Sequence, residues 1–430
     1  MSGDALDWLF ALGQFGIKFG LDNIRALVEA LDHPERSFRA VHIAGTNGKG
    51  SVSAMVEAAL RAAGYRTGRY TSPHLTDIGE RFAIDGRPAA RDSLLTALER
   101  VRAAADALKS RGLLLADPTF FEVTTAAAFV QFREAGADVA VVEVGLGGRL
   151  DATNVLTPEA CAITSIALDH EQYLGNTLDA IAREKAGILK TDVPAVVGPV
   201  PVEAAHAIAD RAEQVRAPLV RAFDGVEHDE PAIDASGEAQ SFRLRTPRRD
   251  YGKVRLALLG RHQLDNAVVA VRLLEALEGR GMPVDASHVL QALATVRWPG
   301  RLERVTTRDG RVAILDAAHN PAGAEALARH LAGTKRPIVF GTMRDKDASA
   351  MIGILARVAS EFVVTQAANS RAVPAEAIAD VARQAAPDVP VHVASDASAA
   401  LDRAWSASPE IVVAGSIFLL GDVLSVLGRS

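Results

Sequence analysis

Two kinds of segment alternate along nearly the whole chain. Short apolar runs, typical of buried strands, are separated by longer stretches whose apolar residues recur at helical spacing. The runs that we interpret as strands are residues 40–44, 138–144, 160–166, 193–198, 312–315, 337–340, 362–365, 390–393 and 411–414. This alternation predicts an α/β fold in which helices connect the strands of largely parallel sheets.

Two segments interrupt this pattern. Residues 223–253 are charged and rich in turn formers, and they predict a small antiparallel appendage or a long excursion from the sheet. The tripeptide at 298–300 (Trp-Pro-Gly) follows a helical stretch, and a fresh α/β pattern begins after it. The chain has 430 residues, which exceeds the roughly 250–300 at which single cores stop growing. We therefore expect two domains, residues 1–297 and 298–430.

Composition narrows the class of protein. Hydrophobic residues make up 49% and charged residues 23% of the chain, as in soluble globular proteins. The net charge of −6 argues against a nucleic-acid partner. The single cysteine, Cys161, lies in an apolar run, so we expect an inert core thiol and no internal disulfide. Neither a secretory signal nor a transmembrane stretch is evident. We expect a cytoplasmic monomer without a membrane partner.

The strongest chemical signal is a glycine-rich heptad. It lies between the predicted strand at 40–44 and a helical pattern, and it consists of Gly45, Thr46, Asn47, Gly48, Lys49, Gly50 and Ser51. Glycines, a lysine and a hydroxyl between a strand and a helix start form a cradle for phosphate groups. The spacing is shorter than in the common P-loop, so an ordinary strand-to-helix turn is the alternative. We expect the heptad to bind a nucleoside triphosphate.

Further polar residues follow predicted strands, where ligands bind in parallel sheets. Glu143 ends a buried run and either binds Mg²⁺ or pairs with Arg149. His170 is either a metal ligand or a structural histidine. Lys185, at the end of a helical segment, is by itself a solvated charge favoured by the helix C-terminus. An Asp and a His in residues 316–321 end a later strand, and a surface turn does not explain them.

These segments resemble the folylpolyglutamate synthase and dihydrofolate synthase family, a branch of the Mur-ligase superfamily. The matching segments are residues 15–24 (FGIKFGLDNI), 42–51 (HIAGTNGKGS), 71–75 (TSPHL), 143–154 (EVGLGGRLDATN), 164–170 (TSIALDH), 183–189 (REKAGIL), 298–303 (WPGRLE), 316–321 (DAAHNP), 340–347 (FGTMRDKD) and 415–422 (GSIFLLGD). The resemblance includes the shortened glycine-rich turn. It implies a P-loop-type, ATP-binding Mur-ligase central domain with a mostly parallel sheet and a smaller Rossmann-like glutamate-ligase domain, with substrates meeting in the cleft.

The resemblance also implies roles for individual residues. The heptad would hold the phosphates of ATP, with Lys49 beside the β- and γ-phosphates. Further nucleotide contacts would come from Asn266, Arg301, Asp316 and His319. Magnesium would be bound by Ser72, Glu143 and His170. Lys185 would be carbamylated by CO₂, and its new carboxylate would organise the metal ligand His170. The residues of catalysis would be Lys49, Lys185, His170 and Arg301.

The implied reaction joins L-glutamate to the carboxylate of dihydropteroate or a folate through an acyl phosphate formed from ATP. A segment at 119–122 resembles the one that forms a dihydropteroate pocket in bifunctional members. By that match the pterin would be contacted by Thr119, Phe121 and Asp151, with core packing as the alternative for Phe121. This favours a bifunctional enzyme.

Three other functions stay open. One is a folylpolyglutamate synthase without the dihydrofolate synthase activity, and another is a non-catalytic nucleotide-binding protein. The third is a ligase that acts on a UDP-sugar peptide. The last is disfavoured, because by the same resemblance a UDP-binding domain would precede the glycine-rich turn, and the residues before Gly45 leave no room for it.

Overall fold

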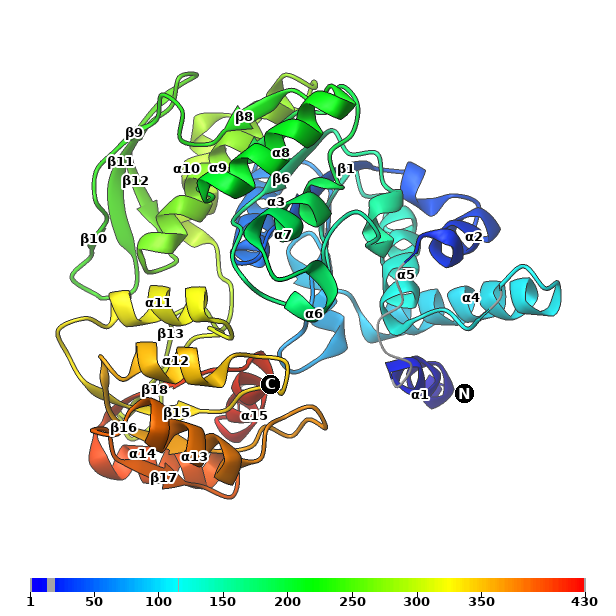
Figure 1. Ribbon diagram of the computed structural model, residues 1–430. Helices are drawn as coiled ribbons and strands as arrows, with labels where there is room; N and C mark the ends of the chain where they lie inside the picture. The colour runs from blue at the N-terminus through cyan, green and yellow to red at the C-terminus, as the bar shows by residue number, and fades with distance from the viewer. Residues whose placement is uncertain (1, 14–19, 115, 429–430) are drawn as a thin grey trace.

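The computed structural model describes residues 2–13, 20–114 and 116–428 (Figure 1). The first part of the family segment at 15–24, residues 15–19, lies outside the described residues. Within the described residues, the strands form an eight-stranded, a four-stranded and a six-stranded sheet. In these parts of the chain no helix combines the length and the apolar character needed to cross a membrane.

The eight-stranded sheet forms the central domain. Its strands, in spatial order, are β4 (Arg87–Pro88), β3 (Phe82–Ile84), β2 (Thr67–Tyr70), β5 (Val139–Glu143), β1 (Arg39–Ala44), β6 (Ala160–Ile163), β7 (Ala195–Val197) and β8 (Leu219–Arg221). β3 pairs antiparallel with both neighbours, and every other pairing is parallel. The strands predicted at 40–44, 138–144, 160–166 and 193–198 are confirmed.

Helices cover both faces of this sheet, which explains its continuous apolar runs. Val41 and Ile43 pack with the helices of one face, α3 (Lys49–Ala62), α9 (Arg261–Glu278) and α10 (Ala286–Thr295). Ala40 and Val142 pack with those of the other, α1 (Ser2–Leu12), α2 (Asp22–Ala30), α4 (Arg91–Ser110) and α5 (Phe120–Glu134). Beside them, α7 (Leu178–Ala186) and α8 (Val202–Val215) cover β6 and β7, where Cys161 is fully buried as expected.

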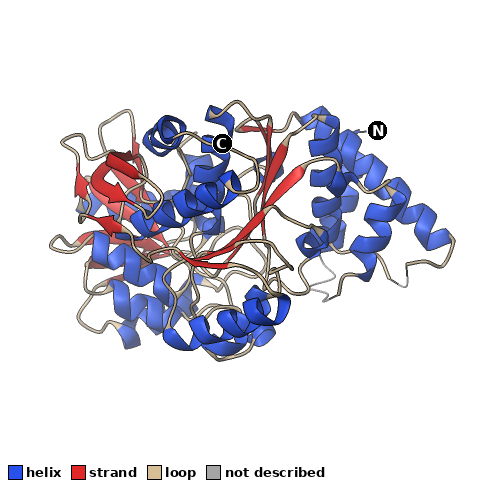
Figure 2. Cartoon of the chain, turned by 90° about the horizontal axis from the view of Figure 1, so that it is seen from above, coloured by secondary structure: helices blue, strands red, loops and turns tan. Residues whose placement is uncertain are grey.

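The predicted appendage is an antiparallel sheet. It comprises β9 (Glu227–His228), β10 (Ala232–Ile233), β11 (Gln240–Arg245) and β12 (Asp250–Leu256). Phe242 and Val254 on its inner face join the core around α9 and α10. The appendage lies on the side of the molecule opposite to the N-terminal helices (Figure 1 and Figure 2).

The C-terminal domain contains the six-stranded sheet. Its order is β13 (Glu303–Thr306), β14 (Val312–Leu315), β18 (Glu410–Ala414), β15 (Arg336–Phe340), β16 (Ala359–Val364) and β17 (Val391–Val393), and all pairings except β13–β14 are parallel. One face is covered by α11 (Pro321–His330), α12 (Ala348–Leu355) and α13 (Ala375–Ala385). The other is covered by α14 (Ala397–Ala407) and α15 (Ile417–Val426). This is the predicted Rossmann-like arrangement of helices around a mostly parallel sheet.

Candidate active site

The order of the central strands assembles the site. β2, β5, β1 and β6 are neighbours, so the loops after their carboxyl ends meet at one edge of the sheet. These loops carry Ser72, Glu143, residues 45–51 and residues 164–170. The backbone N–H of Ser72 interacts with the carboxylate of Glu143 and opposes the effect of burial on its pKa. Two of the three predicted magnesium ligands therefore lie close together.

The glycine-rich turn has a conformation that excludes side chains at two positions. Gly45 and Gly48 have φ of +149° and +88°, which favours glycine. A Cβ on Gly45 would lie 1.9 Å from Thr164 Oγ1, and one on Gly48 would lie 2.3 Å from Asn266 Oδ1. The turn is held against the loop after β6, because the N–H of Thr46 donates to the carbonyl of Ser165 at 2.8 Å. Asn266 from α9 thus borders the turn, as the resemblance implies.

Lys49 lies at the start of α3 and its ammonium group points back over the turn. Lys49 Nζ donates to the carbonyl oxygens of Gly45 at 3.1 Å and Thr46 at 3.2 Å. Ser51 Oγ is buried and has no hydrogen-bond partner among the described residues. A lysine and an unpaired buried hydroxyl at a helix N-terminus fit the phosphates of a nucleotide and its divalent cation.

Glu143 is a buried carboxylate beside these groups. Burial raises its pKa to about 6, although Lys49 and Arg301 oppose this shift. Its Oε1 lies 3.9 Å from Lys49 Nζ. Pairing with Arg149 is the wrong alternative, because Arg149 donates to Glu184 at 2.8 Å. A buried carboxylate that is incompletely neutralised by the protein fits a cation ligand.

Lys185 is not the solvated charge that its place near a helix end suggests. Its side chain is buried, and Nζ donates to the carbonyl of Gly45 at 3.0 Å. Burial, with Lys49 as the second cause, lowers its pKa to about 7. The amine is therefore mostly uncharged at pH values slightly above 7. It lies against the backbone of the glycine-rich turn.

This shift predicts a pH-dependent stability. The folded-state pKa of Lys185 lies below its ordinary value of 10.5, so between about pH 7 and 10.5 the unfolded chain binds the extra proton. The free energy of unfolding should therefore rise with pH across this window, by at most about 1.4 kcal/mol per pH unit from this group. We expect Lys185→Met to lack this rise. Urea unfolding in CO₂-free buffer measures both slopes, and identical slopes would contradict the burial of a neutral amine.

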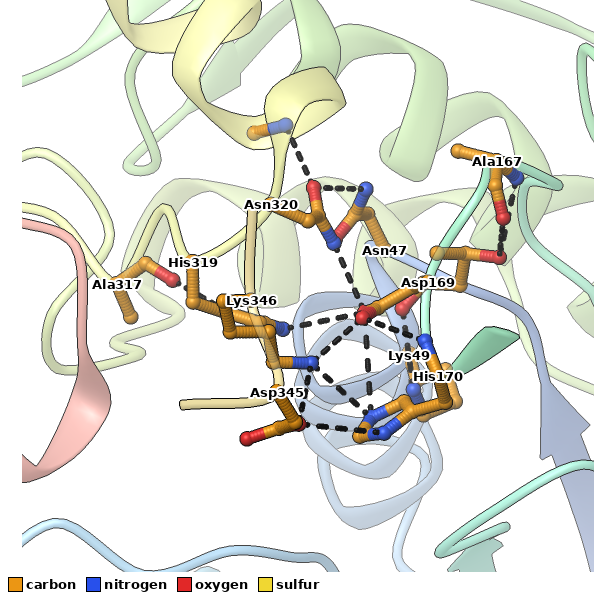
Figure 3. Close-up of polar contacts among 12 residues, drawn as sticks. Asn47, Lys49, Ala167, Asp169, His170, Ala317, His319, Asn320, Asp345 and Lys346 are labelled. Carbon is orange, nitrogen blue, oxygen red and sulfur yellow. Dashed lines mark hydrogen bonds and ion pairs between the residues drawn. The ribbon is translucent and has the colours of Figure 1, made fainter. Parts of the chain in front are cut away.

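An interdomain polar cluster joins the two domains across their interface. It consists of Asp169 and His170 from the central domain and His319, Asn320 and Lys346 from the C-terminal domain (Figure 3). The Asp169 carboxylate accepts from Lys346 Nζ at 2.5 Å and Asn320 Nδ2 at 3.0 Å, and His319 Nε2 lies 3.5 Å away. Burial alone would raise the pKa of Asp169, but His319, His170 and Lys346 hold it far below its usual range.

The two ring nitrogens of His170 face different groups, Lys346 of this cluster and Asp345 beside it. Its Nε2 lies 3.3 Å from Lys346 Nζ, and its Nδ1 lies 3.8 Å from Asp345 Oδ2. Burial is the main cause that lowers its pKa to about 4, so the ring is neutral, as metal binding requires. Among the described residues, no three His, Cys, Asp or Glu side chains form a metal-binding group. Lys49 links His170 to Glu143, because it acts electrostatically on His170 and its Nζ lies 3.9 Å from Glu143 Oε1.

The C-terminal residues of the predicted nucleotide site lie at the same cleft. The guanidinium of the partly buried Arg301 interacts electrostatically with Asp316 and with Glu143 across the domains. Asn320 and Asn47 exchange amide hydrogen bonds at 3.0 and 3.2 Å. Predicted residues from both halves of the chain therefore surround the glycine-rich turn.

The predicted pterin residues lie around residues 145–151. A Cβ on Gly145 would lie 2.4 Å from the ring of Phe121, so this ring packs directly on the loop. The Asp151 carboxylate accepts from the N–H of Leu146 at 2.8 Å and thereby closes the same loop. The hydroxyl of Thr119 caps the start of α5. The structure brings Phe121 and Asp151 together, while the side chain of Thr119 is committed to its helix.

Arg81 is a residue that the sequence did not single out. It is buried, its Nε donates to His74 Nδ1 at 2.8 Å, and its guanidinium lies 5.1 Å from the centre of the Phe120 ring. The side chains that hydrogen-bond it in the described structure, His74 and Tyr70, are neutral, and the carboxylates of Glu143 and Glu80 act on it electrostatically. A buried cation that no described carboxylate hydrogen-bonds is typical of a site for an anionic ligand. No local pattern marks Arg81, because its burial depends on helices distant in sequence.

Comparisons with known proteins agree with this geometry. Two family models match, the Mur ligase middle domain over residues 43–274 and the Mur ligase glutamate ligase domain over residues 300–417. The dihydrofolate synthase/folylpolyglutamate synthase of Bacillus subtilis (strain 168) is 33% identical over 98% of this chain and 97% of its own.

Solved structures extend the likeness to three dimensions. The Mycobacterium tuberculosis folylpolyglutamate synthase complexed with ADP and AMPPCP has a TM-score of 0.92 and 35% identity, covering 100% of both chains. A bifunctional folylpolyglutamate synthase/dihydrofolate synthase with Mn, AMPPNP and L-glutamate bound has a TM-score of 0.85 and 30% identity, covering 99% of this chain and 98% of that chain. The chain belongs to the dihydrofolate synthase/folylpolyglutamate synthase family of the Mur ligases.

Proposed function

We propose that the protein is an ATP-dependent ligase that joins L-glutamate to dihydropteroate and to the tails of folates. The observation that carries this proposal is the convergence of Lys49, the buried Glu143 and Arg301 at the glycine-rich turn. Relatives at 33% identity and beyond carry both activity names. The small-molecule partners are ATP, L-glutamate, dihydropteroate and folates.

The proposed reaction has two steps. A carboxylate oxygen of the pterin substrate attacks the γ-phosphorus of ATP, and ADP leaves, which produces an acyl phosphate. The amine of L-glutamate then attacks the acyl carbon, phosphate leaves with the bond electrons, and the amine loses a proton. Lys49 and Arg301 stabilise the charge on the transferred group, which is the main requirement of phosphoryl transfer. Magnesium, held by Ser72, Glu143 and His170, would neutralise charge on the β- and γ-phosphates.

We propose that Lys185 carries a carbamate. Its neutral amine attacks the carbon of CO₂ and loses a proton, which leaves a carboxylate on Nζ. The lowered pKa and the burial beneath Gly45 support this step, because only the neutral amine is a nucleophile. The new negative charge would lie within electrostatic range of Lys49 and would help to organise His170.

ADP release tests the function directly. The purified protein is supplied with ATP, magnesium and either dihydropteroate or tetrahydrofolate, each with and without L-glutamate. A bifunctional ligase releases ADP with both pterin substrates only when L-glutamate is present. Glutamate-dependent turnover with tetrahydrofolate but not with dihydropteroate would identify a folylpolyglutamate synthase without dihydrofolate synthase activity. A rate of ADP release that does not depend on the pterin substrate or on L-glutamate would contradict the ligase proposal.

Phe121→Ala tests the pterin pocket. Because the ring packs on the loop that also holds Asp151, its loss should lower kcat/KM for dihydropteroate about tenfold, as for other lost aromatic contacts. We expect a smaller effect on tetrahydrofolate, which serves as the internal control for folding. Equal effects on both substrates would mean that Phe121 packs the core without selecting the pterin.

The domain organisation is part of the same proposal. We place the boundary between residues 297 and 298, in the connection between α10 and β13. The gap between the two family matches, from 274 to 300, supports this position. We also propose that the protein is cytoplasmic. We propose further that it is a monomer, because the described residues of its two domains together form the candidate site.

A further inference from the structure

We propose that Trp298 is a positioning residue that fixes Arg301 relative to the glycine-rich turn. It lies in the connection between the two domains, where its indole packs on Gly50 and on Arg69. The inference rests on the proposed function, because Arg301 matters there as a group that stabilises the phosphates.

The edge of the indole contacts the glycine-rich turn. A Cβ on Gly50 would lie 2.7 Å from both Nε1 and Cζ2 of Trp298, closer than side chains approach one another. Gly50 is the residue that separates Lys49 from Ser51 and makes this turn differ from the common P-loop. The space that a side chain on Gly50 would need is therefore occupied by an aromatic ring from the connection between the two domains.

The face of the indole contacts a second fixed group. The guanidinium carbon of Arg69 lies 4.9 Å from the centre of the ring, within the range of a cation–π interaction. Arg69 is itself held by the buried Glu57, which lies 3.4 Å from it and accepts from Thr67 Oγ1 at 2.7 Å. The indole therefore rests on two rigid parts of the central domain, and Arg69 also acts electrostatically on Glu143.

The chain becomes part of the C-terminal domain within two residues of Trp298. The carbonyl of Gly300 accepts from the N–H of Ala317 at 2.8 Å, and the N–H of Leu302 donates to Asp316 Oδ2 at 3.0 Å. Only Pro299, whose ring restricts φ, lies between Trp298, which packs on the central domain, and Gly300, which is hydrogen-bonded to the C-terminal domain. A short and stiff connection of this kind transmits the position of the indole to the residues that follow it.

Arg301 is the residue that depends on this connection. Its NH1 donates to the carbonyl of Gly300 at 3.0 Å, so its guanidinium group is fixed by the same hydrogen-bonded segment. In this position the guanidinium acts electrostatically on Glu143 in the central domain. Without the indole, the connection would keep its attachment to Asp316 and lose its attachments to both Gly50 and Arg69, and Arg301 would shift relative to the phosphates.

The test compares Trp298→Leu with a matched control, Trp405→Leu. Trp405 also packs on an arginine, Arg311 at 4.3 Å, and donates to the carbonyl of Val312 at 3.2 Å, but it lies in the C-terminal domain away from the cleft. We expect Trp298→Leu to lower kcat/KM for ATP at least about tenfold, the scale of loss from misplaced reacting groups. KM for L-glutamate should stay unchanged, and Trp405→Leu should alter stability alone. Equal kinetic effects of the two variants would overturn the proposal.

A second experiment does not depend on the folding of the leucine variant. Trp298→Phe replaces the indole with a smaller phenyl ring. This ring keeps an aromatic face over Arg69 but leaves space beside Gly50. Turnover of Trp298→Phe should stay within about threefold of the unsubstituted protein, since the cation–π contact persists. Gly50→Ala should be clearly less harmful in the Trp298→Phe background. An identical loss from Gly50→Ala in both backgrounds would overturn the proposed contact.

A measurement of nucleotide binding distinguishes a failure of the role proposed for Trp298 from a failure of the proposed function. The chain has three tryptophans, so Trp8→Phe/Trp405→Phe leaves Trp298 as the only indole reporter. We expect its emission to change when ADP and magnesium are added without pterin or glutamate. If the unsubstituted protein does not bind ADP by calorimetry, the proposed function itself fails. If ADP binds and the emission of Trp298 does not respond, the coupling of Trp298 to the nucleotide site is wrong.

Discussion

Lys185→Ala is expected to lower kcat for ligation by about 100-fold, the upper end of the losses seen when groups that orient metal ligands are removed. The variant loses the buried amine that lies beneath Gly45, and with it the carbamate that we propose there. KM for the pterin substrate should change little, because the substrate loop at 145–151 keeps its own hydrogen bonds. ADP release under saturating ATP measures the loss.

Small carboxylates provide the decisive control for Lys185→Ala. Formate or acetate should restore part of the activity by occupying the space of the carbamate. The matched variant is Lys190→Ala, since Lys190 also donates to a backbone carbonyl, that of Asn154 at 3.1 Å, but outside the glycine-rich turn. Lys190→Ala should keep near-normal turnover and should not respond to carboxylates. Near-normal activity of Lys185→Ala without added carboxylate would show that the carbamate proposal is wrong.

Lys346→Met is expected to weaken the docking of the C-terminal domain and to lower kcat by roughly 100-fold. The side chains of Lys346 and Asp169 are only 8% and 7% exposed, and breaking a buried ion pair costs roughly 3–5 kcal/mol. Asn320 and His319 still contact Asp169, so we expect the variant to lose about 3 kcal/mol of interdomain interaction, the low end of this range. The loss should appear in ADP release and as a larger radius of gyration in small-angle scattering.

An exposed ion pair supplies the comparison for Lys346→Met. Lys109 Nζ lies 2.7 Å from Asp117 Oδ1, but these side chains are 57% and 46% exposed. Lys109→Met should therefore change stability by less than about 1 kcal/mol and leave kcat unchanged. If Lys346→Met behaves like Lys109→Met, the interdomain polar cluster does not control the relative position of the domains.

The sequence predicted those parts of the fold whose signals are local. Most of the predicted strands are buried on both faces and read as continuous apolar runs, whereas the edge strand β17, predicted at 390–393, is only partly buried. The strands that it did not predict, β2, β3, β4, β8 and β13, are short or carry polar residues such as Arg69 and Glu303. Their pairing is set by neighbouring strands, so no pattern within each segment could have indicated them.

The candidate site divides in the same way. Glu143, His170 and Asp316 follow buried strands, and that position alone marks them as candidates for a shared edge. The burial of Lys185 and the partner of Lys346 could not be predicted from local sequence. Lys346 pairs with Asp169, 177 residues away, and this contact exists only once two separately folded sheets face one another. The sequence was sufficient to predict which polar residues are candidates for the site. The partner of each charged side chain could be identified only from the tertiary structure.

Asn320 serves the two domains with one side chain. Its Oδ1 accepts from the N–H of Gly323 at 2.8 Å and so begins α11, while its Nδ2 donates to Asn47 and Asp169 across the cleft. The rotamer of Asn320 is therefore fixed by its own helix before the domains meet. Meeting Asn47 costs this side chain little conformational entropy, so closure of the cleft begins from a partly preorganised surface.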